Sequence, residues 1–180
     1  MGRLDPLTAS DPSDLERTLL DSPGTVTQFL ETLTGDLLIA DVVRQYPVTA
    51  GTENDLGVAA GHALTHRITV LKGRTTSRPY LYAESMFVPE RLPEQARAQL
   101  ERTSDPIGRV LVAHGMRPGR EPLPQPERVG AHAPGTVAEL ATEIVWSRAY
   151  RLKIDGLPVF AIREWFLRSV LDALDRQARG

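Results

Sequence analysis

Apolar residues recur at helical spacing near both ends of the chain and at strand spacing between them. A stripe spaced three and four residues apart predicts a helix over 25–34, with Thr25 in position to cap its first turn. The same spacing predicts a short helix that begins at Ser10-Asp11-Pro12, a helix over 93–102 and a closing helix over 165–177.

Runs of β-branched and apolar residues predict strands over 37–48, 62–71, 80–89, 141–154 and 158–164. The alternation in the second strand is regular, and it places Arg67 on the face opposite to Ile68 and Val70. Asp155-Gly156 is a hairpin turn signal that pairs the last two strands. The proline-rich stretch 115–135 is expected to be loop or sheet edge, because proline cannot donate to a central ladder.

This order of elements predicts an α+β fold, in which a single antiparallel β-sheet is flanked by helices. The chain has 180 residues, enough to bury a sizeable core. We expect residues 1–10 to form a flexible lead-in and residues 11–180 to form a single domain.

Composition narrows the function mainly by exclusion. The net charge of −2 gives no reason to expect nucleic acid or a membrane as a partner. The absence of cysteine excludes disulfides, thiolate zinc sites, iron–sulfur ligation and a cysteine nucleophile. The first residues lack the apolar core of a secretory signal, so we expect a cytoplasmic protein.

The sequence contains no fingerprint of a bound cofactor. Dinucleotide-binding, Walker and H-E-x-x-H motifs are all absent. His62 and His66 lie four residues apart, which on a strand separates them by about 13 Å, too far to share one ion. We therefore expect no cofactor and no metal site.

Two charged residues stand out because their strands otherwise suit a core. Arg67 lies in the middle of one strand, and Glu164 ends the last strand directly before Trp165-Phe166-Leu167. Burying an unpaired charge is expensive, so each needs water or a partner. The simplest interpretation is that both face water or form a structural bridge, with each other or with Glu84, Arg148 or Arg151. The other interpretation is a ligand pocket.

Five segments, in this order, favour the pocket: "DSPGTVTQFLE", "LTHRITVLKG", "YLYAESMFVPERL", "SDPIGRVL" and "VWSRAYRLKIDGLPVFAIREWFL". Together they resemble the chorismate lyase family (chorismate–pyruvate lyase, 4-hydroxybenzoate synthase), and the chain is most similar to a diverged, actinobacterial-type member. The resemblance implies a sheet and helices that enclose a buried ligand pocket. It also implies elimination of pyruvate from chorismate to give 4-hydroxybenzoate, without a cofactor.

The resemblance also implies roles for four residues. Arg67 would hold the ring carboxylate, and Glu164 would lie beside the ring hydroxyl, so these two are the candidate catalytic residues. Ile107 would contact the carboxylate through its backbone N–H, and Val26 would lie on a flap over the ligand. The expected partner is a small carboxylate such as chorismate, bound to a monomer or homodimer.

Two departures from the family pattern keep alternatives open. Glu84 stands where other members carry an arginine, and the loop 118–135 is unlike theirs. One alternative is an enzyme of the same fold repurposed for another small-molecule reaction, such as a cyclisation in natural-product biosynthesis. Another is a non-catalytic small-molecule-binding domain, like the ligand-sensing domains of certain transcription regulators.

Overall fold

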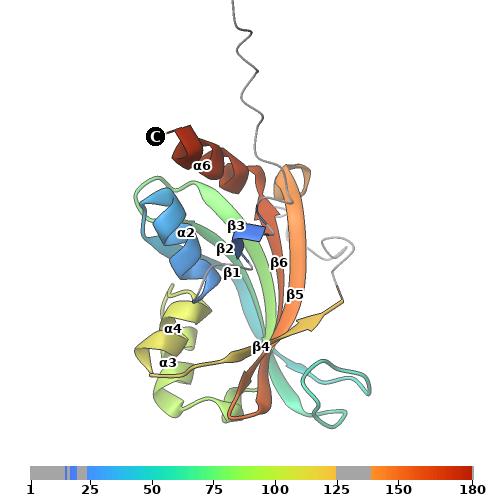
Figure 1. Cartoon of the computed structure of the whole chain (residues 1–180). Coiled ribbons are helices and arrows are strands. Elements are labelled where there is room, and N and C mark those ends of the chain that lie inside the picture. The colour runs from blue at the N-terminus through green and yellow to red at the C-terminus, as the bar shows by residue number, and fades with distance from the viewer. Residues whose placement is uncertain (1–14, 16, 20–23, 125–138, 180) are drawn as a thin grey trace, which may run out of the picture.

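An antiparallel sheet of six strands forms the centre of the computed structural model, which describes residues 15, 17–19, 24–124 and 139–179 (Figure 1). The strands lie in the order β1-β2-β3-β6-β5-β4, and every neighbouring pair is antiparallel. They are β1 (Leu38–Thr49), β2 (Ala63–Gly73), β3 (Pro79–Phe87), β4 (Gly119–Leu123), β5 (Ile144–Ile154) and β6 (Leu157–Leu167). The single antiparallel sheet is confirmed, while the expected lead-in over 1–10 lies outside the described residues.

Three helices of the described part cover one side of this sheet, and a fourth follows the last strand (Figure 1). They are α2 (Val26–Thr34), α3 (Glu94–Arg102), α4 (Ile107–Ala113) and, after β6, α6 (Arg168–Arg179). Short 3₁₀ turns lie at Pro89–Arg91 and Ala141–Glu143, and residues 15 and 17–19 are helical as predicted. No helix of the described part is long and apolar enough to cross a membrane.

The helix-covered side of the sheet is the side that the polar residues of β2 face. Arg67 and Thr69 line a cavity under the helices. Ile68 and Val70 lie on the opposite side, where they pack with Tyr82 and Trp165. The alternation predicted from the sequence is therefore correct, but the more polar face is the one turned inward.

Strand β6 is longer than the sequence predicted. It continues through Glu164 to Leu167, so the following helix begins at Arg168 rather than at residue 165. The cause is packing on both faces: Trp165 stacks on Tyr82 at 5.1 Å between ring centroids, and Phe166 is fully buried in the core on the helix side. Glu164 consequently lies inside the sheet and not at its end.

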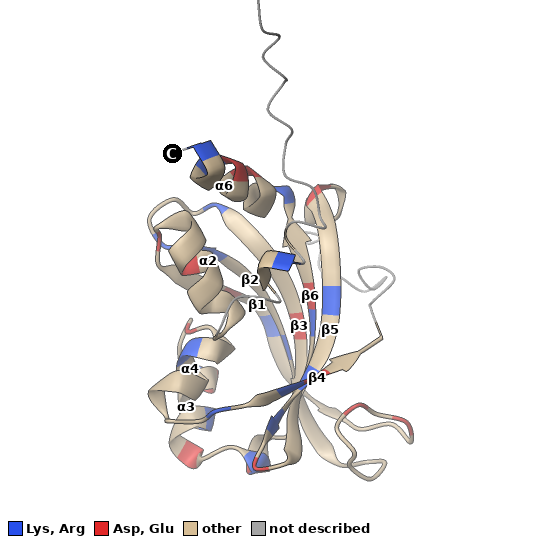
Figure 2. Ribbon diagram, viewed as in Figure 1, with Lys and Arg blue, Asp and Glu red and all other residues tan. Residues whose placement is uncertain are grey.

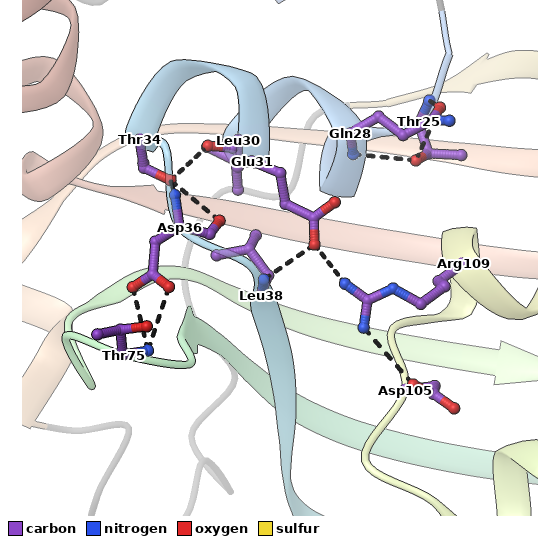
Figure 3. A network of polar contacts seen from close by, with 10 residues as sticks. All are labelled: Thr25, Gln28, Leu30, Glu31, Thr34, Asp36, Leu38, Thr75, Asp105 and Arg109. Atoms are coloured by element: carbon purple, nitrogen blue, oxygen red, sulfur yellow. Dashed lines mark hydrogen bonds and ion pairs between the residues drawn. The ribbon is translucent and has the colours of Figure 1, made fainter.

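The helices over the cavity are tied together by charged side chains (Figure 3). The Glu31 carboxylate on α2 accepts a 2.9 Å hydrogen bond from the backbone N–H of Leu38 and another from the guanidinium of Arg109 on α4. Arg109 also pairs with Asp105 at 3.5 Å. These contacts fix α2 against the start of β1 and against α4.

Candidate active site

A cavity of about 340 Å³ lies between the sheet and helices α2 and α4. This is the size range in which proteins bind small molecules. Its wall comes from inward-facing residues of the central strands, from α4 and from two segments at the ends of helices, residues 24–28 and residues 116–118 with Arg120. The charged side chains that line it are Arg67, Arg117, Arg120 and Glu164.

Arg67 is completely buried in the wall of this cavity. Its Nη1 donates to Oε1 of Gln45 at 2.8 Å and to the carbonyl of Leu100, and its Nη2 donates to the carbonyl of Asp105 at 3.3 Å. Nε has no hydrogen-bond partner. All three acceptors are neutral, and no described carboxylate forms an ion pair with Arg67.

Burial lowers the pKa of Arg67 to about 10, with a smaller opposing effect from the charge of Asp105. The guanidinium therefore stays charged at neutral pH. Burying a charged guanidinium with an unpartnered N–H costs free energy, unless an anion lies beside the guanidinium and accepts a hydrogen bond from that N–H. Arg67 lines the cavity between the sheet and the helices.

Glu164 is 2% exposed and lines the same cavity. Arg148 donates to Oε2 through Nε at 2.6 Å, and the Tyr150 hydroxyl donates to Oε1 at 2.7 Å. The register of β5 and β6 places Arg148 directly opposite Glu164. The structural bridge considered for Glu164 thus exists, with Arg148 as its partner, and its Glu164 end lies in the wall of the pocket.

The environment of this bridge favours a charged Arg148 and a neutral Tyr150. Burial opposes the charge on Arg148, but its interactions with Glu164 and Tyr150 together outweigh burial, and the pKa of Arg148 is raised. Burial and the nearby charge of Glu164 raise the pKa of the Tyr150 hydroxyl. Tyr150 therefore remains a donor, and Glu164 receives two fixed donors from one side.

Val26 and Ile107 complete the four predicted site residues, and both line the cavity. Val26 is the first residue of α2 and Ile107 the first residue of α4. The two helix starts meet closely, because a Cβ added at Gly108 would lie 2.7 Å from Cβ of Thr25. The cavity thus brings together residues from four distant segments of the chain.

Glu84 does not belong to this site. It lies on the other face of β3, where its carboxylate accepts a hydrogen bond from the Tyr82 hydroxyl and lies 3.8 Å from Nε2 of His66. Its neighbour Ser85 faces the cavity and is paired in register with Arg67. The departure from the family pattern at Glu84 therefore changes no cavity-lining side chain.

Sequence reasoning assigned no role to several residues of the site. Gln45, Arg120 and Tyr150 were not singled out, and Arg148 was considered only as a structural partner. For Arg148 and Tyr150 the only signal was their place on the strand that pairs with the strand of Glu164, and the register that brings them to Glu164 is set by a bulge. Among the described residues, no group of three or more His, Asp or Glu could hold a metal ion.

Residues 20–174 match the family described as chorismate pyruvate-lyase Rv2949c-like. The chain belongs to this family. It is 29% identical over 163 residues to the chorismate pyruvate-lyase of Mycobacterium tuberculosis (strain CDC 1551 / Oshkosh), a match that covers 86% of this chain and 80% of that protein. It is 27% identical to the chorismate pyruvate-lyase of Mycobacterium leprae (strain TN), covering 89% of this chain and 78% of that protein.

Solved structures show the same fold at much lower identity. PhnF from Mycobacterium smegmatis superposes with a TM-score of 0.52 at 14% identity, covering 83% of this chain and 66% of the PhnF chain. The possible transcriptional regulator YydK from Bacillus subtilis gives a TM-score of 0.53 at 12% identity, covering 74% of this chain and 60% of that chain. At these identities the likeness concerns the fold alone.

Proposed function

We propose that this protein is a chorismate lyase, which eliminates pyruvate from chorismate and releases 4-hydroxybenzoate. Membership of the chorismate pyruvate-lyase family supports this reaction class. The observation that carries the proposal is the pair of Arg67 and Glu164 in one cavity: a buried cation without an ion pair, and a carboxylate already held by two donors.

Arg67 binds the ring carboxylate of the substrate. A carboxylate accepts two parallel N–H bonds from a guanidinium, and Arg67 has an unpartnered Nε–H beside an Nη2 that carries a second N–H. The backbone N–H of Ile107, at the first position of α4, adds a contact to the same carboxylate. Val26 covers the ligand from α2.

Glu164 accepts a hydrogen bond from the ring hydroxyl. An ionised carboxylate offers about four lone-pair directions, and Arg148 and Tyr150 occupy two of them. The remaining capacity is available on the cavity side. A carboxylate held from behind in this way orients the hydroxyl, and with it the adjacent ring carbon, relative to the leaving group.

The reaction needs positioning more than chemical activation. The ring carbon that bears the hydroxyl loses its proton, and the electron pair of that C–H bond completes the aromatic ring. The bond between the ring and the enolpyruvyl oxygen breaks, and its electron pair stays on that oxygen. The released enolate takes up a proton at its methylene carbon and becomes pyruvate. No redox equivalent enters this balance, so we propose that the enzyme works without a cofactor.

The direct test is incubation of the purified protein with chorismate, with pyruvate followed by a coupled lactate dehydrogenase assay and 4-hydroxybenzoate by chromatography. We expect the two products in equal amounts, well above the spontaneous background. Arg74→Ala serves as the matched control, because Arg74 is exposed in the β2–β3 turn and does not line the cavity. Failure of the wild-type protein to release pyruvate would contradict the proposal.

A further inference from the structure

The charges around the cavity are unbalanced in favour of positive charge. Arg67, Arg117 and Arg120 line it, whereas its one lining carboxylate, Glu164, is already paired with Arg148. Arg67 is completely buried, while Arg117 and Arg120 are exposed and lie on the segment that leads from α4 into β4 (Figure 2). The cavity therefore has one cation at its base and two at its mouth.

Arg120 is the better held of the two arginines at the mouth. Its Nη2 donates to the carbonyl of Gly24 at 3.0 Å, and its guanidinium lies 5.3 Å from the ring centroid of Tyr150. These contacts join edge strand β4, the segment before α2 and the residue that holds Glu164. Arg117 has no comparable hydrogen bond or ion pair with a described residue.

The cation at Arg120 is also without an anion. No carboxylate of the described residues forms an ion pair with it, although neighbouring Glu121 pairs with Arg151 and Lys153. A guanidinium has five N–H donors, and the Gly24 carbonyl takes one. Arg120 is therefore fixed, charged and still able to grip a carboxylate at the cavity mouth.

We propose that Arg120 forms a second anion subsite, which binds the second carboxylate of a dicarboxylate substrate while Arg67 binds the first. This inference rests on the proposed function, in which the second carboxylate is that of the enolpyruvyl group. It makes Arg120 the residue that distinguishes the dicarboxylate substrate from the monocarboxylate aromatic product. Loss of the enolpyruvyl group then releases one of the two anchors, and the product leaves more readily than the substrate.

The test compares chorismate, with two carboxylates, and 4-hydroxybenzoate, with one, on Arg120→Ala and Arg74→Ala. For Arg120→Ala we expect KM for chorismate to rise about tenfold or more, the effect of losing one partly exposed charge pair. The dissociation constant of 4-hydroxybenzoate, measured by calorimetry, should change by less than about threefold, because that ligand does not need the second subsite. Arg74→Ala, which removes the same charge elsewhere, should change neither value.

An unchanged KM for chorismate in Arg120→Ala would overturn the inference. An equal loss of affinity for chorismate and 4-hydroxybenzoate would also overturn it, because Arg120 would then act only through its hydrogen bond to the Gly24 carbonyl. Should Arg120→Ala lose its fold, Arg120→Gln gives the same comparison, because glutamine can still donate to the Gly24 carbonyl. If wild-type protein turns over no chorismate, the proposed function fails separately. Calorimetry with chorismate then still tells whether Arg120 recognises the second carboxylate.

Discussion

At the scale of single residues, the site is built around charges whose burial is unfavourable without a ligand. Arg67 reaches three neutral acceptors but leaves Nε without a partner. Stability alone would favour an apolar residue of similar volume at this position, because the free energy of desolvating a buried charge often exceeds the free energy gained from its interactions. Its position in the wall of a cavity agrees with the carboxylate-binding role proposed above.

Glu164 is expected to orient the ligand and to neutralise Arg148 at the same time. Glu164→Gln keeps one acceptor for the ring hydroxyl, so we expect kcat to fall by less than about 100-fold, toward the low end of the range for a general base. Glu164→Ala should fall further. Both variants should also lower the free energy of unfolding, because Arg148 loses its partner in a buried setting.

Steady-state kinetics and chemical denaturation of the same preparations separate the two roles. Tyr150→Phe is the matched control, since it removes one donor to Glu164 and leaves the Arg148 pair in place. Its unfolding free energy should change less than that of Glu164→Gln. A Gln variant with wild-type rate and wild-type stability would contradict both roles.

Glu84 gives a prediction for pH dependence on the opposite face of the sheet. Burial acts to raise its pKa, but the hydrogen bond from Tyr82 and the interaction with His66 outweigh burial, so its pKa lies below the ordinary value of 4.5. As the pH falls below 4.5, Glu84 therefore binds a proton more readily in the unfolded state than in the folded state. The free energy of unfolding decreases as the pH falls through this range. Glu84→Gln should flatten this acid limb in pH-dependent urea denaturation.

The same substitution tests whether Glu84 matters for the reaction. Because Glu84 faces away from the cavity, we expect Glu84→Gln to leave the rate of chorismate turnover at neutral pH within about twofold of the wild-type rate. A tenfold loss of turnover without a loss of folded protein would place Glu84 in the catalytic machinery and refute its assignment to the opposite face.

At the scale of elements, the cavity depends on the close approach of α2 and α4 at Gly108. A Cβ at this position would lie 2.7 Å from Cβ of Thr25, so the two helix starts must separate. We expect Gly108→Ala to reduce the free energy of unfolding by about 1–3 kcal/mol, as overpacking typically does, and to weaken 4-hydroxybenzoate binding. Denaturation and calorimetry measure the two effects.

Gly119→Ala provides the control for this substitution. Gly119 begins β4 beside the cavity-lining Arg120, yet an added Cβ would meet nothing within 4 Å, and its backbone needs no left-handed conformation. We expect its stability and its affinity for 4-hydroxybenzoate to match those of the wild type. Equal effects of the two substitutions would show that helix packing at Gly108 is not what shapes the cavity.

Local signals predicted most elements, and long-range packing decided the rest. Thr25 caps α2 through a capping box with Gln28, and Gly35 ends that helix in a left-handed conformation, as their residue types indicate. The extension of β6 to Leu167 escaped prediction because its helix-like apolar spacing is overridden by pairing with β3. Residues 119–123 form an edge strand, in agreement with the expectation of loop or edge.

The partners of Glu164 show why the site itself was only partly predictable. A regular two-residue hairpin at Asp155-Gly156 would pair Glu164 with Ser147. A register shift between Leu152 and Lys153 places Arg148 opposite Glu164 instead. Such a bulge moves every following side chain by one position, and the sequence carries no clear signal for it. Strand alternation, by contrast, correctly separates Arg67 from Ile68 and Val70, but it does not indicate which of the two faces turns toward the helices.

At the scale of the whole molecule, one face of the sheet lines the cavity and the other packs an apolar cluster. The cavity lies on the helix side, between two apolar clusters. Helices α2 and α6 form one cluster against the sheet, and helices α3 and α4 form the other. The opposite side is occupied by the Trp165 cluster and by the Glu84 contacts. The fold is shared at 12–14% identity with PhnF and with the possible transcriptional regulator YydK, and one fold can carry different sites.

The central claim is that the buried Arg67 exists to bind a carboxylate in this cavity, and calorimetric titration of 4-hydroxybenzoate into wild type and Arg67→Ala tests it most directly. Removing one partner of a buried charge pair costs about 2–5 kcal/mol. The account therefore predicts that Arg67→Ala stays folded but loses measurable binding and releases no pyruvate from chorismate, whereas Arg74→Ala behaves as wild type. Equal affinity of the wild-type protein and a folded Arg67→Ala variant would contradict it.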